Sequence, residues 1–342
     1  MAPTTMKQWK LTGRGDYDQL KLETDQPVPK VGENDILVKV KAVSLNYRDI
    51  SIVRGTYPFP LTDVVVPISD AAGVVEEVGS RVTRFKKGDK VLPTFHQAQQ
   101  PGKPSLGGPI DGVAREYLVV SELDAALMPK DYDFVQGSTL PCAALTAWDA
   151  LFGLEGRTLK PGDWVLTQGT GGVSLFALQL AKAAGATVVS TTSSSSKTEI
   201  LKSLGADHVI NYKEDGDWGK TAKGLTPAGA GFQHVIEIGG PGTLKQSLNA
   251  IGFQGVISVI GFVAGSDDQM PSLLECLSYQ CIARGIFVGS REQCEDMVRA
   301  IDSNGLKPVV DKEVFDFEDL PKAYQYMEAQ KHVGKVVVKF SD

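Results

Sequence analysis

A glycine-rich turn between an apolar strand and an apolar helix restricts the fold of this 342-residue chain more than any other feature. Residues 164–166 are predicted to form an apolar strand that leads into the turn. A helix follows the turn, and a second strand is predicted over residues 186–191. The turn consists of Gly169, Thr170, Gly171, Gly172, Val173 and Ser174. One strand-helix-strand unit of about thirty residues predicts an α/β protein with a doubly wound parallel sheet.

The spacing of the glycines indicates that this turn binds a dinucleotide. Glycine permits a tight turn and lets a pyrophosphate approach the backbone N–H groups at a helix N-terminus. Ser174 replaces the third glycine of the G-x-G-x-x-G pattern, and its small side chain still permits close packing of helix on strand. We therefore predict that the residues of the turn contact the cofactor.

The end of the second strand indicates which nucleotide binds. An NAD site usually carries Asp or Glu about twenty residues beyond the glycines, where it accepts hydrogen bonds from the ribose 2′-hydroxyl. Here residues 190–196 are all serine or threonine and are followed by Lys197, and the first acidic residue is Glu199. Ser193, Lys197 and Tyr212 could bind a 2′-phosphate, so NADPH is the predicted cofactor. The alternative is that the serines form a flexible loop and Lys197 is a solvated surface charge.

Composition limits the class of protein. A net charge of −6 without a long basic run argues against nucleic acid and membrane partners. No apolar run approaches the length of a membrane span and the N-terminal residues have no signal-like apolar core, so a soluble cytoplasmic protein is expected. Four scattered cysteines are too few for a disulfide framework in a chain of this size.

The pattern along the chain predicts two domains. Residues 1–130 are rich in short alternating or apolar strands, which is typical of a barrel-like β domain. Strands and helices alternate over residues 131–289, which predicts the dinucleotide-binding domain. Residues 290–342 return to two helical stretches around a strand and a final strand, and we assign them to the first domain.

Several motifs resemble those of the medium-chain dehydrogenase/reductase superfamily. The resemblance is to its zinc-free branch, whose members are similar to quinone oxidoreductases. They are SLNYRD at residues 44–49, PISDAAGVVEEVG at 67–79, LPCAALTAW at 140–148, GTGGVSLFALQLAK at 169–182 and LGADHVINY at 204–212. The resemblance covers essentially the whole chain. It implies a GroES-like (chaperonin-10-like) β domain beside a Rossmann domain, and a homodimer joined edge to edge through residues 281–289.

The resemblance also indicates which residues stand at the zinc-binding positions of related enzymes. The zinc-ligand positions of related alcohol dehydrogenases fall at Asn46, Ser69 and Cys142, with Asp70 in place of a nearby Glu. Zinc requires three protein ligands from Cys, His or carboxylate, and only Cys142 is a strong one. The loop that carries a structural zinc in that branch, here residues 95–110, contains no cysteine. No metal is expected.

Without a metal, transfer of a hydride to an activated alkene or a quinone is the expected reaction, because the negative charge delocalises into an enolate or quinol. Resemblance and residue type together suggest hydrogen-bond donors to the small-molecule substrate. They are Asn46, Tyr47, Arg48 and Tyr57. Tyr47 could instead belong to the core, and Arg48 could form a structural ion pair with Asp49. Which group donates the proton stays open, as does the role of Cys142.

The resemblance assigns further residues to the nicotinamide and ribose. They are Thr146, Gly239, Gly261, Phe262, Phe287 and Val288. Residues 237–240, at the end of a strand, are expected near the adenine ribose.

Two other functions remain open at this stage. One is a metal-independent alcohol or ketone dehydrogenase, and the other is a nucleotide-binding protein with a non-catalytic role. The physiological substrate is not indicated.

Overall fold

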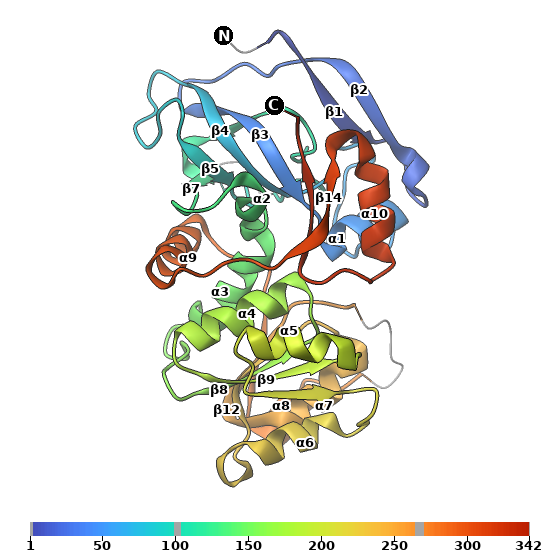
Figure 1. Ribbon diagram of the computed structural model, residues 1–342, viewed down its shortest axis with the longest axis vertical. Helices are drawn as coiled ribbons and strands as arrows, with labels where there is room; N and C mark the ends of the chain where they lie inside the picture. The colour runs from blue at the N-terminus through green and yellow to red at the C-terminus, as the bar shows by residue number, and fades with distance from the viewer. Residues whose placement is uncertain (1–2, 99–103, 264–269, 342) are drawn as a thin grey trace. The chain divides into compact units, whose positions relative to one another are not determined.

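The computed structural model describes residues 3–98, 104–263 and 270–341. The chain divides into two compact units, Met1–Ala143 with Ser290–Asp342, and Ala144–Gly289. Each unit has its own sheet, and Figure 1 traces both along the chain.

The first unit is built on a seven-stranded, mostly antiparallel sheet with the order β14-β15-β3-β4-β5-β7, in which β6 also pairs with β3. Its strands are β3 (Asp35–Ser44), β4 (Asp70–Val78), β5 (Lys90–Pro93), β6 (Tyr117–Ser121), β7 (Ala125–Leu127), β14 (Val310–Asp316) and β15 (Lys335–Lys339). A separate antiparallel pair is formed by β1 (Thr5–Leu11) and β2 (Leu20–Pro27). The C-terminal segment contributes β14 and β15 to the seven-stranded sheet.

Helices of the first unit lie at the ends and on the faces of these strands. They are α1 (Tyr47–Arg54), α2 (Phe134–Gly137), α9 (Arg291–Asn304) and α10 (Leu320–Glu328), with short 3-10 turns η1 (Tyr17–Gln19), η2 (Glu122–Asp124) and η6 (Phe317–Asp319). A π-helical turn, η3 (Leu140–Ala144), precedes the second unit. Inward side chains such as Val38, Val40 and Val338 form the core of the β domain.

The second unit is a parallel six-stranded sheet with the order β10-β9-β8-β11-β12-β13. Its strands are β8 (Trp164–Gln168), β9 (Thr187–Thr192), β10 (His208–Asn211), β11 (Phe232–Glu237), β12 (Ile251–Val259) and β13 (Ile282–Gly285). This is the doubly wound order that the glycine turn predicts. Leu166, Val189, Val235 and Ile257 fill its core, and these strands read as apolar runs because both faces of the sheet are covered.

Helices cover both faces of the parallel sheet, with α4 and α5 on one side and α6 and α7 on the other (Figure 1). The helices of this unit are α3 (Leu145–Phe152), α4 (Gly172–Ala183), α5 (Thr198–Ser203), α6 (Trp218–Leu225), α7 (Pro241–Ala250) and α8 (Leu274–Tyr279), with short turns η4 (Ser195–Lys197) and η5 (Pro227–Gly229). Both strands and the helix of the predicted βαβ unit are present. The π-helical turn η3 runs directly into α3, so the helical segment from Leu140 to Phe152 is not one continuous α-helix.

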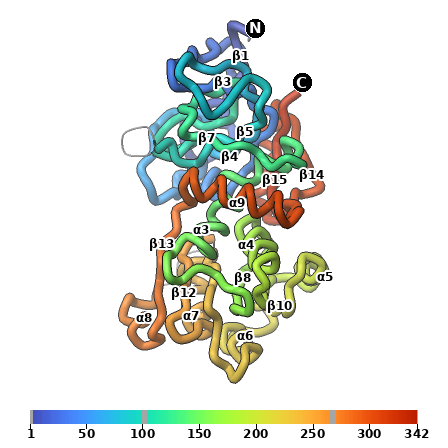
Figure 2. Tube along the Cα trace, turned by 90° about the vertical axis from the view of Figure 1, so that its left-hand side faces the viewer, coloured from blue at the N-terminus to red at the C-terminus, as the bar shows by residue number. Residues whose placement is uncertain are grey.

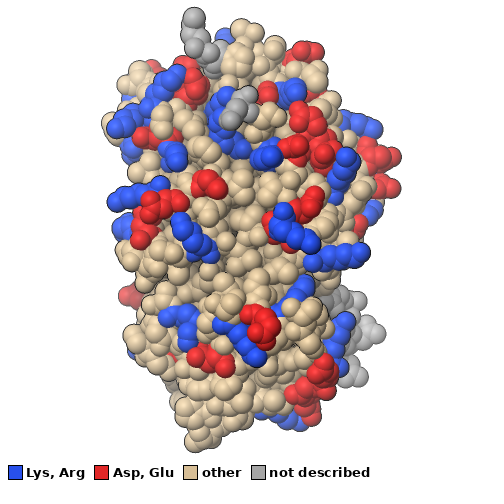
Figure 3. All heavy atoms as spheres, viewed as in Figure 1, with Lys and Arg blue, Asp and Glu red and all other residues tan. Residues whose placement is uncertain are grey.

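Among the described residues, no helix has the length and apolar character needed to cross a membrane. On the face of the molecule drawn in Figure 3, acidic and basic side chains are interspersed without a field of one sign. Such a face offers no basic surface to a nucleic acid.

Candidate active site and cofactor site

The glycine turn of the second unit is open in front of the helix that follows it. Gly169 has a φ of 74°, and a Cβ added at Gly169 or Gly171 would meet no atom within 4 Å. Gly171 is the N-cap of α4 and provides no side-chain hydrogen bond to the first turn of the helix. The N–H groups of that turn, at Gly172 and Val173, are therefore oriented to receive an anion.

Ser174 closes this turn. It is buried, and its hydroxyl donates a hydrogen bond of 2.6 Å to the carbonyl oxygen of Gln168, the last residue of β8. The serine thus ties the first turn of α4 to the strand while its small side chain keeps helix and strand close. The substitution that weakens the match to the glycine pattern is compatible with the expected geometry.

Register places the predicted ribose residues at the same edge of the sheet as the glycine turn. Gln168 of β8 lies opposite Thr191 of β9, and Thr192 lies opposite Asn211 of β10. The Tyr212 N–H donates to the Thr192 carbonyl oxygen at 3.0 Å, so Tyr212 stands beside the chain that continues to Ser193. Tyr212 is 41% exposed.

The loop after β9 is compact and carries hydroxyl groups. Ser194 and Ser196 exchange a hydrogen bond of 2.7 Å between their hydroxyls, and the Lys197 N–H donates to the Ser194 carbonyl oxygen. Ser193 and Lys197 are both partly exposed. Because the segment carries a cation and no carboxylate, it can receive an anionic group.

The ends of β11 and β12 approach each other through glycines. Gly240 has a φ of 76°, and a Cβ there would lie 2.8 Å from the Gly261 carbonyl oxygen and 2.9 Å from the Phe262 Cα. A Cβ on Gly239 would collide with the side chain of Thr243. The predicted cofactor residues Gly239, Gly261 and Phe262 therefore belong to one tightly packed strand-end region.

Glu237, at the end of β11, lies among internal hydrogen-bond donors. Its carboxylate is fully buried and accepts hydrogen bonds of 2.9 Å from the N–H groups of Gly239 and Gly240 and from Gln168 Nε2. Ser247 also donates to it. These contacts engage the carboxylate inside the unit, where it orders the turn after β11.

The remaining nicotinamide candidates differ in exposure. Thr146 is buried in α3, and Phe287 is 46% exposed after β13. Val288 is buried and has a φ of 65°, a region that a β-branched residue rarely adopts. Backbone strain of this kind is concentrated at functional segments of proteins.

In the first unit, Asn46 belongs to a buried polar cluster with Ser44, Asp70 and Lys335. Asn46 Nδ2 donates to Asp70 Oδ2 at 3.0 Å, and the Ser44 hydroxyl donates to the same oxygen at 3.3 Å. Lys335 Nζ donates to Asn46 Oδ1 at 2.5 Å and lies 3.4 Å from Asp70 Oδ2. Burial raises the pKa of Asp70, and the Lys335 ammonium and the Asn46 amide oppose that rise.

Sequence reasoning missed Lys335. The residue begins the final strand, where a lysine before an apolar run reads as a surface charge, yet it is only 3% exposed. The segment GKVVVKF carried no signal for this, because Val336, Val337 and Val338 are all buried while Lys339, on the same face of the strand as Lys335, is exposed.

The donors at the former zinc positions do not suit zinc. Asn46 Oδ1 already accepts from an ammonium, and burial raises the pKa of the Cys142 thiol, which opposes formation of a thiolate ligand. In the part of the chain that the structure describes, no group of three His, Cys, Asp or Glu side chains could hold a metal. The Lys335 ammonium would also repel a dication at this place.

Two buried polar atoms at this cluster lack a hydrogen-bond partner among the described residues, Asp70 Oδ1 and the Ser69 hydroxyl. The residue before them, Ile68, is buried with a φ of 71°. A strained β-branched residue therefore leads the chain into β4 beside the polar cluster.

Arg48 and Tyr57 form a second arrangement in the same unit. The Arg48 guanidinium is buried, donates to the Leu106 carbonyl oxygen at 3.0 Å and lies 3.6 Å from Asp49. Its Nε donates to the Tyr57 hydroxyl at 3.4 Å, and its centre lies 5.2 Å from the Tyr57 ring. Burial raises the pKa of Tyr57, although Arg48 opposes that rise. Tyr57 therefore stays protonated at neutral pH.

Tyr47 is partly buried and packs against the core of the β domain. Asn46, Tyr47 and Tyr57 are all partly exposed, whereas Arg48 is buried and engaged in internal contacts. The structure thus brings Arg48 to Tyr57 and Asn46 to Lys335.

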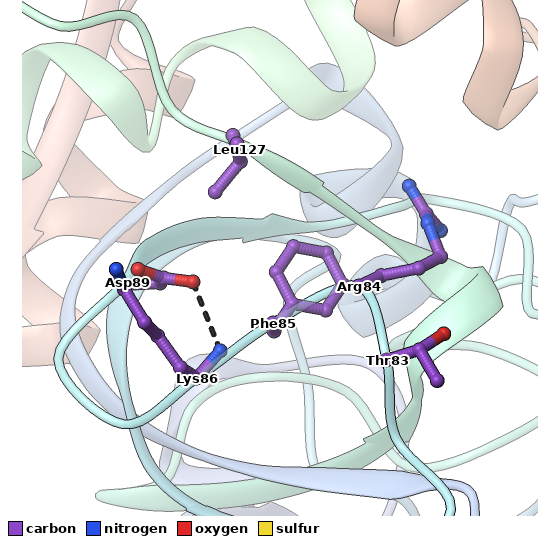
Figure 4. A pocket seen from close by; sticks show the side chains of 6 residues that line it. All are labelled: Thr83, Arg84, Phe85, Lys86, Asp89 and Leu127. Carbon is purple, nitrogen blue, oxygen red and sulfur yellow. Dashed lines mark hydrogen bonds between the residues drawn. The ribbon is translucent and has the colours of Figure 1, made fainter.

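A shallow hollow of about 360 Å³ lies elsewhere on the β domain (Figure 4). Its lining is Thr83, Arg84, Phe85, Lys86, Asp89 and Leu127. Arg84 is engaged by the Glu122 carbonyl oxygen and by Glu295. None of the predicted site residues lines this hollow.

Comparison with known proteins identifies both halves of the chain. Residues 32–130 match the alcohol dehydrogenase GroES-like domain, and residues 172–303 match the zinc-binding dehydrogenase domain. The chain is 46% identical over 333 residues to the zinc-type alcohol dehydrogenase-like protein C1773.06c of Schizosaccharomyces pombe (strain 972 / ATCC 24843), covering 94% of this chain and 96% of that protein. The chain belongs to the medium-chain dehydrogenase/reductase family.

Two further relatives of this family differ in the cofactor that their names give. The NADPH-dependent alkenal/one oxidoreductase, chloroplastic, of Arabidopsis thaliana is 31% identical over 346 residues, covering 98% of this chain and 80% of that protein. A crystal structure of an NAD-dependent alcohol dehydrogenase is 30% identical with a TM-score of 0.88, covering 98% of this chain and 100% of that one. The predicted GroES-like and Rossmann architecture is confirmed, and the protein is an oxidoreductase of this family that binds a pyridine nucleotide.

Proposed function

We propose that this medium-chain oxidoreductase uses NADPH, without zinc, to reduce the activated C=C bond of an enone or a quinone. The observation that carries the proposal is the Asn46 carboxamide, which is held between the Lys335 ammonium and the Asp70 carboxylate. This hydrogen-bonded amide lies at a position where related zinc enzymes are expected to carry a metal ligand. A hydrogen-bond donor stabilises an oxygen whose charge is delocalised better than it stabilises an alkoxide. One well-placed donor contributes about 3 kcal/mol to such a transition state.

The residues of the two units have separate tasks in this proposal. A bound reduced nicotinamide would supply the hydride that is added to the β-carbon of the substrate. Asn46 Nδ2 donates a hydrogen bond to the carbonyl oxygen, where the electron pair displaced from the C=C bond accumulates as an enolate. The protonated Tyr57 hydroxyl, held by Arg48, supplies the proton that completes the saturated product, and it regains a proton from water.

NADPH is favoured over NADH by the loop after β9. Ser193, Lys197 and Tyr212 are the proposed partners of the 2′-phosphate, and the segment from Thr192 to Lys197 carries no carboxylate to repel it. In a fluorescence titration NADPH is expected to bind at least about tenfold more tightly than NADH, and Lys197→Met should remove most of that preference. Equal affinities in the wild type would contradict this part of the proposal.

Turnover is tested by measuring NADPH oxidation with a panel of quinones, enones, saturated aldehydes and ketones. Reduction of enones or quinones, with metal analysis of chelator-free protein finding no zinc, is the expected result. Reduction confined to saturated ketones and aldehydes would favour the metal-independent alcohol dehydrogenase that the relatives' names suggest. Cofactor binding without any oxidation would favour a non-catalytic role, and one zinc per chain would overturn the metal-free mechanism.

We further propose that the protein is a homodimer joined through the free edge of β13. In the described part of the parallel sheet β13 is the last strand, and an unpaired edge invites another strand. Figure 2 shows α8 beside β13 at this end of the sheet. Leu273, Leu274 and Leu277 at α8 are 86%, 73% and 75% exposed, which is typical of an apolar surface that a partner covers.

A further inference from the structure

Lys335 is buried at a place where packing alone would favour an apolar residue. It begins β15, whose Val337 lies opposite Ser44 at the end of β3. Next to it the Leu45 N–H donates to the Val336 carbonyl oxygen at 3.0 Å. Removing an ammonium from water is costly unless its donors are all satisfied, so this position requires an electrostatic explanation.

The ammonium is fully satisfied by three acceptors. Lys335 Nζ donates to the Leu45 carbonyl oxygen at 2.7 Å, to Asn46 Oδ1 at 2.5 Å and to Asp70 Oδ2 at 3.4 Å. Lysine has three N–H donors and no acceptor, so all of its hydrogen-bonding capacity is used here. Two of these acceptors belong to the segment that leads into α1, and the third is the buried carboxylate of Asp70.

The chemistry of these neighbours determines the orientation of the Asn46 carboxamide. A lysine can only donate, so the atom that faces Lys335 must be the amide oxygen. The atom 3.0 Å from the Asp70 carboxylate must then be the amide nitrogen. The backbone is held as well, because the Asn46 N–H donates to Asp49 Oδ2 at 2.7 Å.

One N–H of the carboxamide is left for a ligand. Asn46 Nδ2 carries two hydrogens, and Asp70 is its only acceptor among the described residues. Asn46 is partly exposed, whereas Lys335 and Asp70 are buried behind it. An ammonium bound to the amide oxygen withdraws electron density from the amide, which strengthens its N–H groups as donors.

We propose that Lys335 is a positioning residue whose ammonium orients and polarises the Asn46 carboxamide, so that Asn46 Nδ2 donates to the carbonyl oxygen of the substrate. This inference rests on the proposed function, because it names the group that binds the enone or quinone oxygen. Lys335 itself does not contact the substrate.

A purely structural role for Lys335 makes a different prediction. If the lysine only neutralised Asp70, removing both charges together would restore a functional protein. The double variant Lys335→Met with Asp70→Asn removes both charges and leaves no unpaired ion in the core. The matched control is Lys182→Met with Asp207→Asn, which removes the 2.8 Å Lys-Asp pair of the second unit.

The experiment measures three quantities in the full-length protein. In the Lys335/Asp70 variant, we expect kcat for enone reduction to fall about 10- to 100-fold, less than the roughly 100- to 1000-fold for complete removal of a donor, because Asn46 itself is retained. The dissociation constant for NADPH and the far-ultraviolet circular dichroism should stay as in the wild type. The Lys182/Asp207 control should keep kcat within about twofold, since surface pairs contribute little. Wild-type kcat in the Lys335/Asp70 variant would overturn the proposal.

A spectroscopic probe separates this inference from the proposed function. 4-Dimethylaminocinnamaldehyde absorbs at longer wavelength when a donor polarises its carbonyl, and with NADP⁺ present it is bound without being reduced. We expect a red shift with the wild type that is lost in Asn46→Ala and in the Lys335/Asp70 variant. A wild type that shifts the probe but reduces no enone or quinone would refute the proposed function alone. An unshifted wild-type spectrum, or an equal shift in the Lys335/Asp70 variant, would refute the role of Lys335.

Discussion

Individual buried polar residues decide the electrostatics of both units. Lys335 and Asp70 are 3% and 0% exposed, and Glu237 in the other unit is 0% exposed. Each is surrounded by named donors or acceptors, because an unpaired buried charge is costly. Residues of this kind couple stability and function to pH and to single substitutions.

His234 should make the protein less stable in mild acid. It is buried in β11, and burial lowers its pKa to about 4, although Asp163 at 4.0 Å opposes the shift. Unfolded histidine titrates near 6.5, so protons bind the unfolded chain more readily. The stabilisation is complete above pH 6.5 and is lost as the pH falls toward 4, by about 3 kcal/mol in total.

The measurement is urea unfolding of the wild type and of His234→Leu at several pH values between 7 and 4. The leucine variant should lose about 3 kcal/mol less of its free energy of unfolding across this range. His208→Leu, at an exposed histidine of β10, is the control and should behave as the wild type does. Parallel pH curves for wild type and His234→Leu would contradict the prediction.

Tyr57→Phe tests the proposed proton donor. The variant keeps the ring that packs beside Arg48 and loses only the hydroxyl. We expect kcat to fall by about 100-fold, at the lower end of the range for general acid catalysis, with NADPH affinity unchanged. The control is Tyr326→Phe, which removes a partly buried hydroxyl that donates to Asp311 and should leave kcat unchanged. Full turnover by Tyr57→Phe on every accepted substrate would exclude the acid role.

At the scale of elements, strand ends and helix starts create the cofactor site. The carboxyl ends of β8, β9 and β10 share one edge of the sheet, and α4 begins there with an uncapped turn. The same glycines that weaken this segment as a helix leave room for a ligand. Stability and cofactor binding should therefore respond in opposite directions to one substitution.

Gly171→Asp is the variant that separates the two effects. Gly171 has a φ of −79° and a ψ of 168°, which any residue can adopt. Aspartate at the N-cap stabilises a helix more than glycine does, by roughly a few tenths of a kcal/mol. The carboxylate would occupy and repel the pyrophosphate position, so NADPH affinity should fall at least about tenfold while the thermal midpoint stays or rises. Gly171→Ala is the control with a smaller loss of affinity. Unchanged NADPH binding by Gly171→Asp would place the pyrophosphate elsewhere.

At the scale of the whole molecule, the proposed dimer depends on the free edge of the parallel sheet. Ile282–Gly285 forms β13, and Arg284 of that strand pairs with Asp149 at 2.9 Å, which secures the edge strand within its own unit. An ordered edge strand beside exposed leucines is a surface suited to a second copy of the chain.

Leu274→Glu with Leu277→Glu should convert the proposed dimer to a monomer. Two carboxylates on each copy would face each other across a symmetric interface and would be buried without partners. Light scattering coupled to size exclusion should give twice the chain mass for the wild type and the single mass for the variant. Leu127→Glu, at a 52% exposed leucine of the first unit, should stay dimeric. A monomeric wild type would rule out the dimer, and a dimeric double variant would exclude this surface.

The sequence by itself determined the order of strands and helices, the doubly wound sheet and the glycine turn. These features depend on the periodicity of apolar residues and on the positions of glycines, and both are patterns among residues close together in the sequence. It also indicated that the former zinc positions hold poor ligands, since that argument needs only residue types. The π-helical turn at Leu140–Ala144 was not indicated, because no local pattern distinguishes it from an α-helix.

Only the tertiary structure decided which polar side chains act together. Lys335 meets Asp70 across 265 residues and Asn46 across 289, and neither separation has a periodic signature. The burial of the Glu237 carboxylate likewise depends on a hydrogen bond from Gln168, which is 69 residues away in the sequence. The physical reason is that burial turns a charged residue from a solvated surface group into one that must find its partners, and those partners are supplied by strands that meet only in the folded sheet.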